Sequence, residues 1–170
     1  MDNIKLYNVD SAYIDYLSAY APHLFFNKQK DQRNERKYIG IVLTVNGINY
    51  FAPLSSYKDK HKLMKERIDF IKIKRYAVIN LNNMFPVADG TFEYVDISKE
   101  RNPRYRDLLR TEYRYIKSIQ EKIRKNAANL YHLKLTVGNT NALTKRCNDF
   151  LALEKACKGY QRRQNLIKRV

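Results

Sequence analysis

Residues 55–61 concentrate side chains that could bind and cleave a phosphodiester. Within seven residues the segment holds two serine hydroxyls, two ammonium groups and one imidazole, from Ser55, Ser56, Lys58, Lys60 and His61. Hydroxyls can donate hydrogen bonds to phosphate oxygens, ammonium groups neutralise their charge, and histidine exchanges protons near neutral pH. Local roles are the alternatives, namely an ST-turn for Ser56 and a capping contact for His61. The segment therefore predicts a site that binds a phosphate and moves protons.

A predicted β-hairpin comes directly before this segment and would position it. Its first strand is apolar on both faces, with Ile39, Ile41 and Leu43 alternating with Gly40, Val42 and Thr44, so we expect cover on both sides. Asn46 and Gly47 favour a two-residue turn, because both positions require positive φ. The chain then returns through residues 48–52, and Pro53 is expected to end the strand because proline cannot donate to a ladder.

Two chemical routes to phosphodiester cleavage can be compared from the sequence. A metal-held water needs clustered carboxylates, but Asp89 and Glu93 come closest and Val95 stands where such a site would need lysine. The histidines, at 23, 61 and 132, form no paired motif. We therefore expect no metal and no other cofactor. RNA offers the second route, since its own 2′-hydroxyl can attack the adjacent phosphate while the protein aligns groups and stabilises charge.

Several segments, taken in order, resemble a known family. They are Ala52-Pro53-Leu54-Ser55-Ser56-x-Lys58-x-x-His61; Tyr7 with residues 11–17; Ile79-Asn80-Leu81 with Met84 and Pro86; and Pro103, Tyr105 and Leu109. This ordered set, over about residues 4–135, resembles the ToxN/AbiQ family of RNA-cleaving toxins from type III toxin–antitoxin systems.

The resemblance implies a function, a partner and a fold. The function is a sequence-specific endoribonuclease of phage-abortive infection, leaving a 2′,3′-cyclic phosphate. Its catalytic residues would be Ser56, Ser55, Lys58, Arg36, Tyr13 and His61, with Arg36 as a phosphate-neutralising cation and Tyr13 donating from a helix. The partners are cellular or phage RNA as substrate and an inhibitory repeat RNA that joins toxin subunits into a closed assembly. The family also uses a tyrosine upstream of Tyr38, which this chain lacks between Tyr20 and Tyr38.

The fold implied is α+β, with a twisted, mostly antiparallel and partly barrel-like sheet wrapped by helices, as in the Kid/MazF toxins. Strands early and helices late fit that class. The 170 residues suit one domain, 1–170, with a basic tail at about 161–170 expected to be disordered. Asn80 lies inside an apolar strand; a structural bond at a sheet end is expected, and the resemblance suggests that it braces the active-site loop.

The charge of the chain favours a polyanionic partner. Lys and Arg number 33 against 17 Asp and Glu, a net charge of +16. Membrane binding is the alternative, but the apolar runs are too short to span a bilayer. No signal peptide is visible at Met1, so we expect a cytoplasmic protein without membrane contact. Cys147 and Cys157 fit no common metal spacing and are expected to be core or incidental residues.

Two basic surfaces are candidates for RNA contact. Residues 27–37 form a charged loop, either a solvated loop or a basic flap over the site. From Pro103 a long helix is expected, with an apolar face and an opposite basic face that is either solvated or in contact with phosphates. We expect RNA contacts from Lys37, Lys60, Asn80, Arg106, Arg110, Arg114 and Lys117. A non-catalytic RNA-binding protein is the alternative function, since it would share the charge but would not need residues 55–61.

Overall fold

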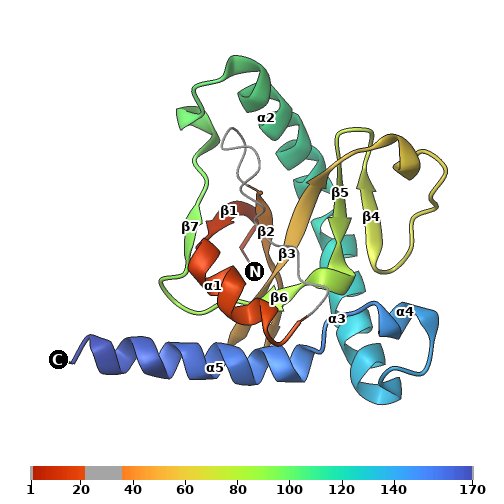
Figure 1. Cartoon of the computed structure of the whole chain (residues 1–170). Helices are drawn as coiled ribbons and strands as arrows, with labels where there is room; N and C mark the ends of the chain where they lie inside the picture. Colours follow the sequence, from red (N-terminus) through yellow and green to blue (C-terminus); the bar gives the residue numbers. More distant parts are fainter. Residues whose placement is uncertain (1, 22–35, 170) are drawn as a thin grey trace.

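The computed structural model describes residues 2–21 and 36–169. Its strands are β1 (Lys5–Val9), β2 (Tyr38–Val45), β3 (Ile48–Ser56), β4 (Phe70–Ile73), β5 (Ala77–Asn80), β6 (Phe85–Pro86) and β7 (Phe92–Tyr94). Its helices are α1 (Ser11–Ser18), α2 (Pro103–Ser118), α3 (Gln120–Val137), α4 (Ala142–Lys145) and α5 (Phe150–Ile167), with short 3-10 helices η1 (Asp59–His61), η2 (Leu81–Asn83) and η3 (Ile97–Lys99). The strands precede most of the helices, which confirms the α+β class (Figure 1).

The described strands form a mostly antiparallel sheet in the order β4-β5-β3-β2-β1-β7, and β6 pairs with β3. Strands β4 and β7 lie at opposite ends of this order and do not pair with each other, so the described sheet is not closed into a barrel. The partly barrel-like curvature and the likeness to Kid/MazF stay predictions. Among the described helices, none is both long and apolar enough to cross a membrane.

Strand β3 is the centre of this sheet and carries residues 55 and 56 at its end. It pairs with β2 as far as Pro53, opposite Tyr38, and with β5 from Leu54 onward. The prediction that Pro53 ends the strand is wrong, because β3 continues to Ser56. Beyond Pro53 the Leu54 N–H donates to Lys37 O at 3.0 Å, next to β2, and residues 54–56 pair with β5 on the other side. The predicted turn is confirmed, with Asn46 and Gly47 at φ 49° and 78°.

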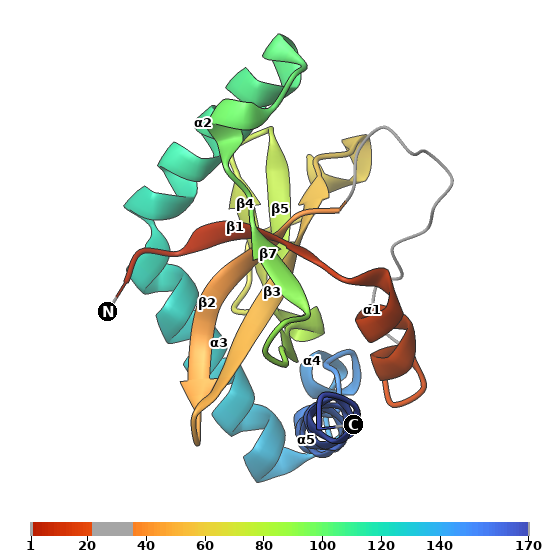
Figure 2. The ribbon, with the colours of Figure 1, turned by 90° about the vertical axis from the view of Figure 1, so that its left-hand side faces the viewer.

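Helices cover the sheet on both faces (Figure 2). One buried cluster packs α2 and α3 on the sheet and includes Ile39, Ile116 and Ile123. A second cluster packs α1 and α5 on the other face and includes Tyr38 and Phe51. The expectation that the hairpin is covered on both sides is therefore confirmed. The central strand is also tied to both helical layers, because the Tyr50 and Tyr131 hydroxyls each donate to Glu154 Oε1 at 2.7 Å.

The helical half departs from the expected boundaries. The long helix predicted from Pro103 is two helices, α2 and α3, because Ile119 leaves helical geometry with φ −115° and ψ 13°. Gly138, at φ 57°, ends α3 as predicted. Helix α5 begins after Asp149, whose Oδ1 accepts from Ala152 N at 3.0 Å, and continues to Ile167. Residues 161–167 of the predicted disordered tail are therefore helical.

A buried carboxyl on α2 gives a prediction for stability. Burial raises the pKa of Glu112 from 4.5 to about 7. The folded state thus binds this proton more tightly than the unfolded state does. The protonated Glu112 carboxyl therefore makes its full contribution to stability below pH 4.5 and loses it as pH rises through about 7. We expect Glu112→Gln to raise the free energy of unfolding by roughly 2 kcal/mol at pH 8, after allowing for solvent screening, and to change it little at pH 4. Urea unfolding at both pH values measures this.

The matched control for this prediction is Glu93→Gln, which removes an exposed carboxylate from β7. It should change the free energy of unfolding equally little at pH 4 and pH 8. An equal effect of Glu112→Gln at the two pH values would show that the Glu112 carboxyl does not titrate differently in the folded and unfolded states.

Candidate active site

The end of β3 brings together residues from two strands and from the segment before β2 around the Ser55 hydroxyl. Ser55 lies opposite Val78 of β5, which fixes the direction of its side chain. Arg36, two residues before β2, donates from Nη1 to Ser55 Oγ at 2.8 Å. Asn80, the last residue of β5, approaches the same oxygen with Nδ2 at 3.5 Å. A guanidinium and an amide thus converge on one serine hydroxyl.

The neighbouring groups are open to solvent. Ser56 pairs with Ala77 through the backbone, and its side chain is exposed at the end of the strand. Lys58 and Lys60 are exposed in the loop that follows. Burial lowers the pKa of Arg36, although a guanidinium remains charged at any physiological pH. An anion at this end of β3 would therefore meet the half-buried Arg36 cation and the exposed ammonium groups of the following loop.

His61 has a different setting from the exposed lysines of its loop. It is only 5% exposed and packs between Tyr57 and Phe70, with ring centroids 5.5 and 5.6 Å away. Its Nδ1 accepts from the Lys58 N–H at 2.9 Å, which is the capping contact considered as the alternative. Burial, followed by the charges of Lys60, Lys58 and Lys72, lowers the pKa of His61 and favours the neutral ring. Proton transfer by His61 stays a prediction.

Tyr13 does not join this site. Its side chain is 0% exposed in the cluster between α1 and α5. The hydroxyl donates to Pro86 O at 2.8 Å, and the ring packs on Tyr160 at 4.9 Å. The prediction that Tyr13 donates to the scissile phosphate is wrong for this arrangement, because the hydroxyl is sealed in the core and its proton is already used. The apolar spacing that placed Tyr13 on a packed helix face was correct.

The predicted RNA-binding residues lie on several elements. Lys37 Nζ donates to Asn8 Oδ1 at 2.7 Å and is tied to β1. On α2, Arg110, Arg114 and Lys117 are exposed, whereas Arg106 is half-buried. The N-terminal half of α2 and the end of β3 point toward the same end of the molecule in Figures 1 and 2. Residues 27–35 of the predicted flap lie outside the described residues.

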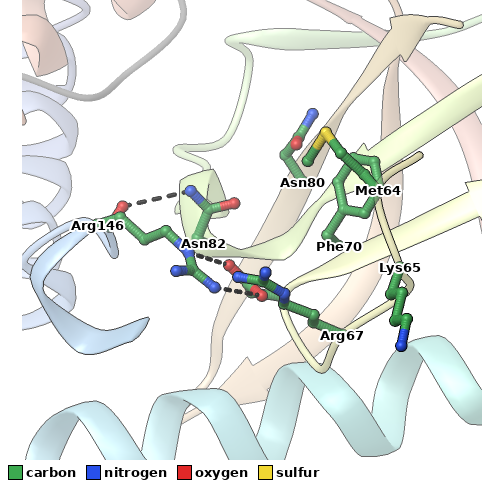
Figure 3. A pocket seen from close by; sticks show the side chains of 8 residues that line it. Met64, Lys65, Arg67, Phe70, Asn80, Asn82 and Arg146 are labelled. Atoms are coloured by element: carbon green, nitrogen blue, oxygen red, sulfur yellow. Dashed lines mark hydrogen bonds and ion pairs between the residues drawn. The ribbon is translucent and has the colours of Figure 1, made fainter. Parts of the chain in front are cut away.

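Sequence reasoning missed a cavity that adjoins Ser55 through Asn80 (Figure 3). Its volume is about 230 Å³, and it is lined by Met64, Lys65, Arg67, Asp69, Phe70, Asn80, Asn82 and Arg146. Asn82 lies two positions after Asn80, so the polar residues at the end of β5 were the available signal. Nothing in the sequence connects Arg146 to this region. In the described part of the chain, no group of three or more His, Cys, Asp or Glu side chains is placed to hold a metal ion.

Comparison with known proteins identifies the family. The model of the toxin ToxN family of type III toxin–antitoxin systems matches residues 5–158. The chain belongs to this family. The resemblance found in the sequence is thereby confirmed.

The relatives of this ToxN-family chain are named as nucleases. It is 29% identical to endoribonuclease ToxN of Bacillus thuringiensis subsp. kurstaki, an alignment covering 99% of this chain and 90% of the relative. It is 28% identical to endoribonuclease AbiQ of Lactococcus lactis subsp. lactis, covering 94% and 91%.

Solved structures agree with the ToxN-family fold. One, from work on selective toxin inhibition by a non-coding RNA pseudoknot in type III systems, superposes with a TM-score of 0.83 and 27% identity, covering 94% of this chain and 99% of that one. The structure of AbiQ, described as a lactococcal anti-phage endoribonuclease, gives 0.79 and 26% identity, covering 95% and 99%.

Proposed function

We propose that this ToxN-family enzyme is a sequence-specific endoribonuclease that cleaves RNA without a metal ion. The substrate's 2′-hydroxyl attacks the adjacent phosphate, leaving a 2′,3′-cyclic phosphate and a 5′-hydroxyl. The observation that supports this most directly is the contact of Arg36 with Ser55, beside the exposed Ser56 and Lys58. The endoribonuclease names of the relatives support the same reaction class.

The hydrogen bonds of Ser55 suggest how it takes part. A serine oxygen can accept two hydrogen bonds and donate one. Because Arg36 and Asn80 both direct donors at Oγ, the O–H of Ser55 is left to point toward a phosphate oxygen. Ser56 provides a second hydroxyl, and Arg36 and Lys58 oppose the charge that develops on the phosphorane. These groups are positioned before substrate binds, which is the condition for effective electrostatic stabilisation.

Product analysis in the presence of a chelator tests this function. The purified protein should cut RNA in EDTA, and the 5′ fragments should carry a 2′,3′-cyclic phosphate while the 3′ fragments carry a free 5′-hydroxyl. Mass spectrometry of the fragments distinguishes these ends from those of hydrolysis. Fragments with 5′-phosphates, or an absolute requirement for a divalent ion, would contradict the proposal.

We also propose that a repeat RNA inhibits this toxin by joining toxin subunits into a closed assembly. Toxin and RNA would meet in the cytoplasm. A similar solved structure comes from work on toxin inhibition by an RNA pseudoknot. The net charge of +16 and the exposed basic side chains of α2 give this chain a surface that attracts RNA. Substrate and inhibitor would then compete for one basic surface.

The basic face of α2 gives a test of RNA binding. Neutralising Arg110, Arg114 and Lys117 to Gln should weaken binding of both RNAs, because their exposed cations would release counterions on contact with phosphates. The slope of log K against log salt should flatten by about 0.7 for each lost single-strand contact. Salt titrations of affinity measure this.

As a matched control, three exposed lysines on other elements, Lys145, Lys155 and Lys158, can be changed to Gln to give the same charge difference. An equal effect of the two triple variants would show that only net charge matters. An unchanged slope for the α2 variant would show that its basic face is solvated surface.

A further inference from the structure

One wall of the cavity beside Ser55 is held by hydrogen bonds between side chains. Asp69 is 2% exposed and accepts from Arg146 Nε at 2.6 Å and from Nη2 at 3.0 Å. This bidentate pair joins the turn before β4 to the segment after α4, and it holds one wall of the cavity. Asn82 Nδ2 donates to the Arg146 carbonyl at 3.3 Å, which orients the Asn82 amide. The polar wall is therefore held in place by groups from two distant parts of the chain.

The hydrogen bonds of the wall leave one acceptor for a ligand. Asn82 donates with Nδ2, and among the described residues no donor is paired with its Oδ1. Figure 3 shows Asn82 between Arg146 and the side chains of Asn80, Phe70 and Met64. The cavity thus has the Asn82 amide on one side and an apolar wall, formed by Met64 and the ring of Phe70, on the other.

The chemistry of this wall selects the class of ligand. Phosphates are expected beside the exposed Lys65 and Arg67, and not at the polar wall, where the charge of Arg146 is already matched by the buried Asp69 carboxylate. A neutral, flat, polar-edged group is favoured, because it can lie on Met64 and Phe70 and bond the Asn82 amide. About 230 Å³ is also less than the roughly 300–1,000 Å³ typical of sites for larger ligands. One base of a single strand meets these conditions.

We propose that this cavity binds one unpaired nucleobase of the RNA substrate next to the cleaved bond, and that Asn82 reads its edge. The proposal rests on the proposed endoribonuclease function and names the part of the protein that makes cleavage sequence-specific. Asn80 connects the two sites, since it lines the cavity and contacts Ser55 Oγ. Lys65 and Arg67, exposed at the same cavity, can hold the neighbouring phosphates.

Abasic substrates test this proposal. The cleavage sites of the wild-type protein are first mapped on a long RNA, and a short substrate is then made with one abasic nucleotide at each position flanking the cut. At one position, loss of the base should lower kcat/KM about 10- to 100-fold, the range expected for one stacked base. Asn82→Leu should lower kcat/KM on the intact substrate. Removing the base from the substrate should then lower kcat/KM of this variant by less than about a further threefold.

Controls separate base binding from a structural role. Asn129→Leu makes the same substitution at an exposed position of α3 and should keep the full abasic penalty. If Asn82→Leu does not fold, Met64→Ala replaces it, because Met64 is 42% exposed and its loss removes only the apolar wall. The proposal would be overturned if the abasic nucleotide lowered kcat/KM by the same factor in the Asn82 or Met64 variant as in the wild type. It would also be overturned if no abasic position lowered kcat/KM of the wild type. If the wild type cuts no RNA, the endoribonuclease function fails and this inference fails with it.

Discussion

An RNA substrate that lacks only the 2′-hydroxyl at the scissile nucleotide is expected to remain uncut in a reaction containing EDTA. In the proposed mechanism this hydroxyl is the nucleophile, so its removal abolishes the reaction, and the protein supplies no replacement. In this mechanism the residues around the Arg36–Ser55 contact donate hydrogen bonds and positive charge to the phosphate, and the substrate provides the nucleophile. Gel analysis of the end-labelled substrate measures the result, with the all-RNA substrate cut in parallel.

The control is a substrate with one 2′-deoxy nucleotide a few positions away from the cut. It should be cleaved at close to the rate of the all-RNA substrate, because the remote hydroxyl takes no part in bond formation. Continued cleavage of the substrate that is deoxy at the scissile position would rule out attack by the 2′-hydroxyl.

Ser56→Ala is expected to lower kcat by about 100- to 1,000-fold, the effect of removing one preorganised donor to a developing oxyanion. The Ser56 side chain is exposed, and the residue is held in the ladder by its backbone opposite Ala77, so stability should change little. RNA affinity should also change little, because one neutral hydroxyl adds less to ground-state binding than to the transition state. Single-turnover cleavage at saturating protein, with separate affinity measurements, distinguishes these quantities.

Ser98→Ala serves as the matched control, because Ser98 is an exposed serine whose hydroxyl donates locally to Asp96 at 2.6 Å. It should leave both kcat and affinity close to the wild-type values. If Ser56→Ala retained more than about a third of the wild-type kcat, Ser56 would be a turn residue and not a phosphate donor.

The parts of the site that depend on neighbouring residues were predictable from the sequence. Asn46 and Gly47 set the hairpin turn through their own backbone preferences, and this turn places Ser55 and Ser56 at the end of β3. The order of the family segments also led to Arg36 and Asn80, which the structure brings to Ser55. The roles of these residues stay predictions, because no ligand contact tests them.

The parts that depend on distant pairing were not predictable. Pro53 was expected to end a strand because it has no N–H. Whether that missing donor interrupts the hydrogen-bond ladder depends on which strand lies beside Pro53. Tyr13 was placed on a packed face, but its partner Pro86 is far away in sequence. The cavity needs Arg146 to meet Asp69, and no local pattern in a single sequence predicts that contact.

The ties between the C-terminal segments and the sheet affect how the protein matures during its synthesis. The Arg146–Asp69 pair, the bond from Asn148 N to Asn82 O at 2.9 Å and the Glu154 contacts with Tyr50 all require residues that leave the ribosome long after residues 55–61. A nascent chain can therefore expose its serines and lysines while the wall beside them is still missing.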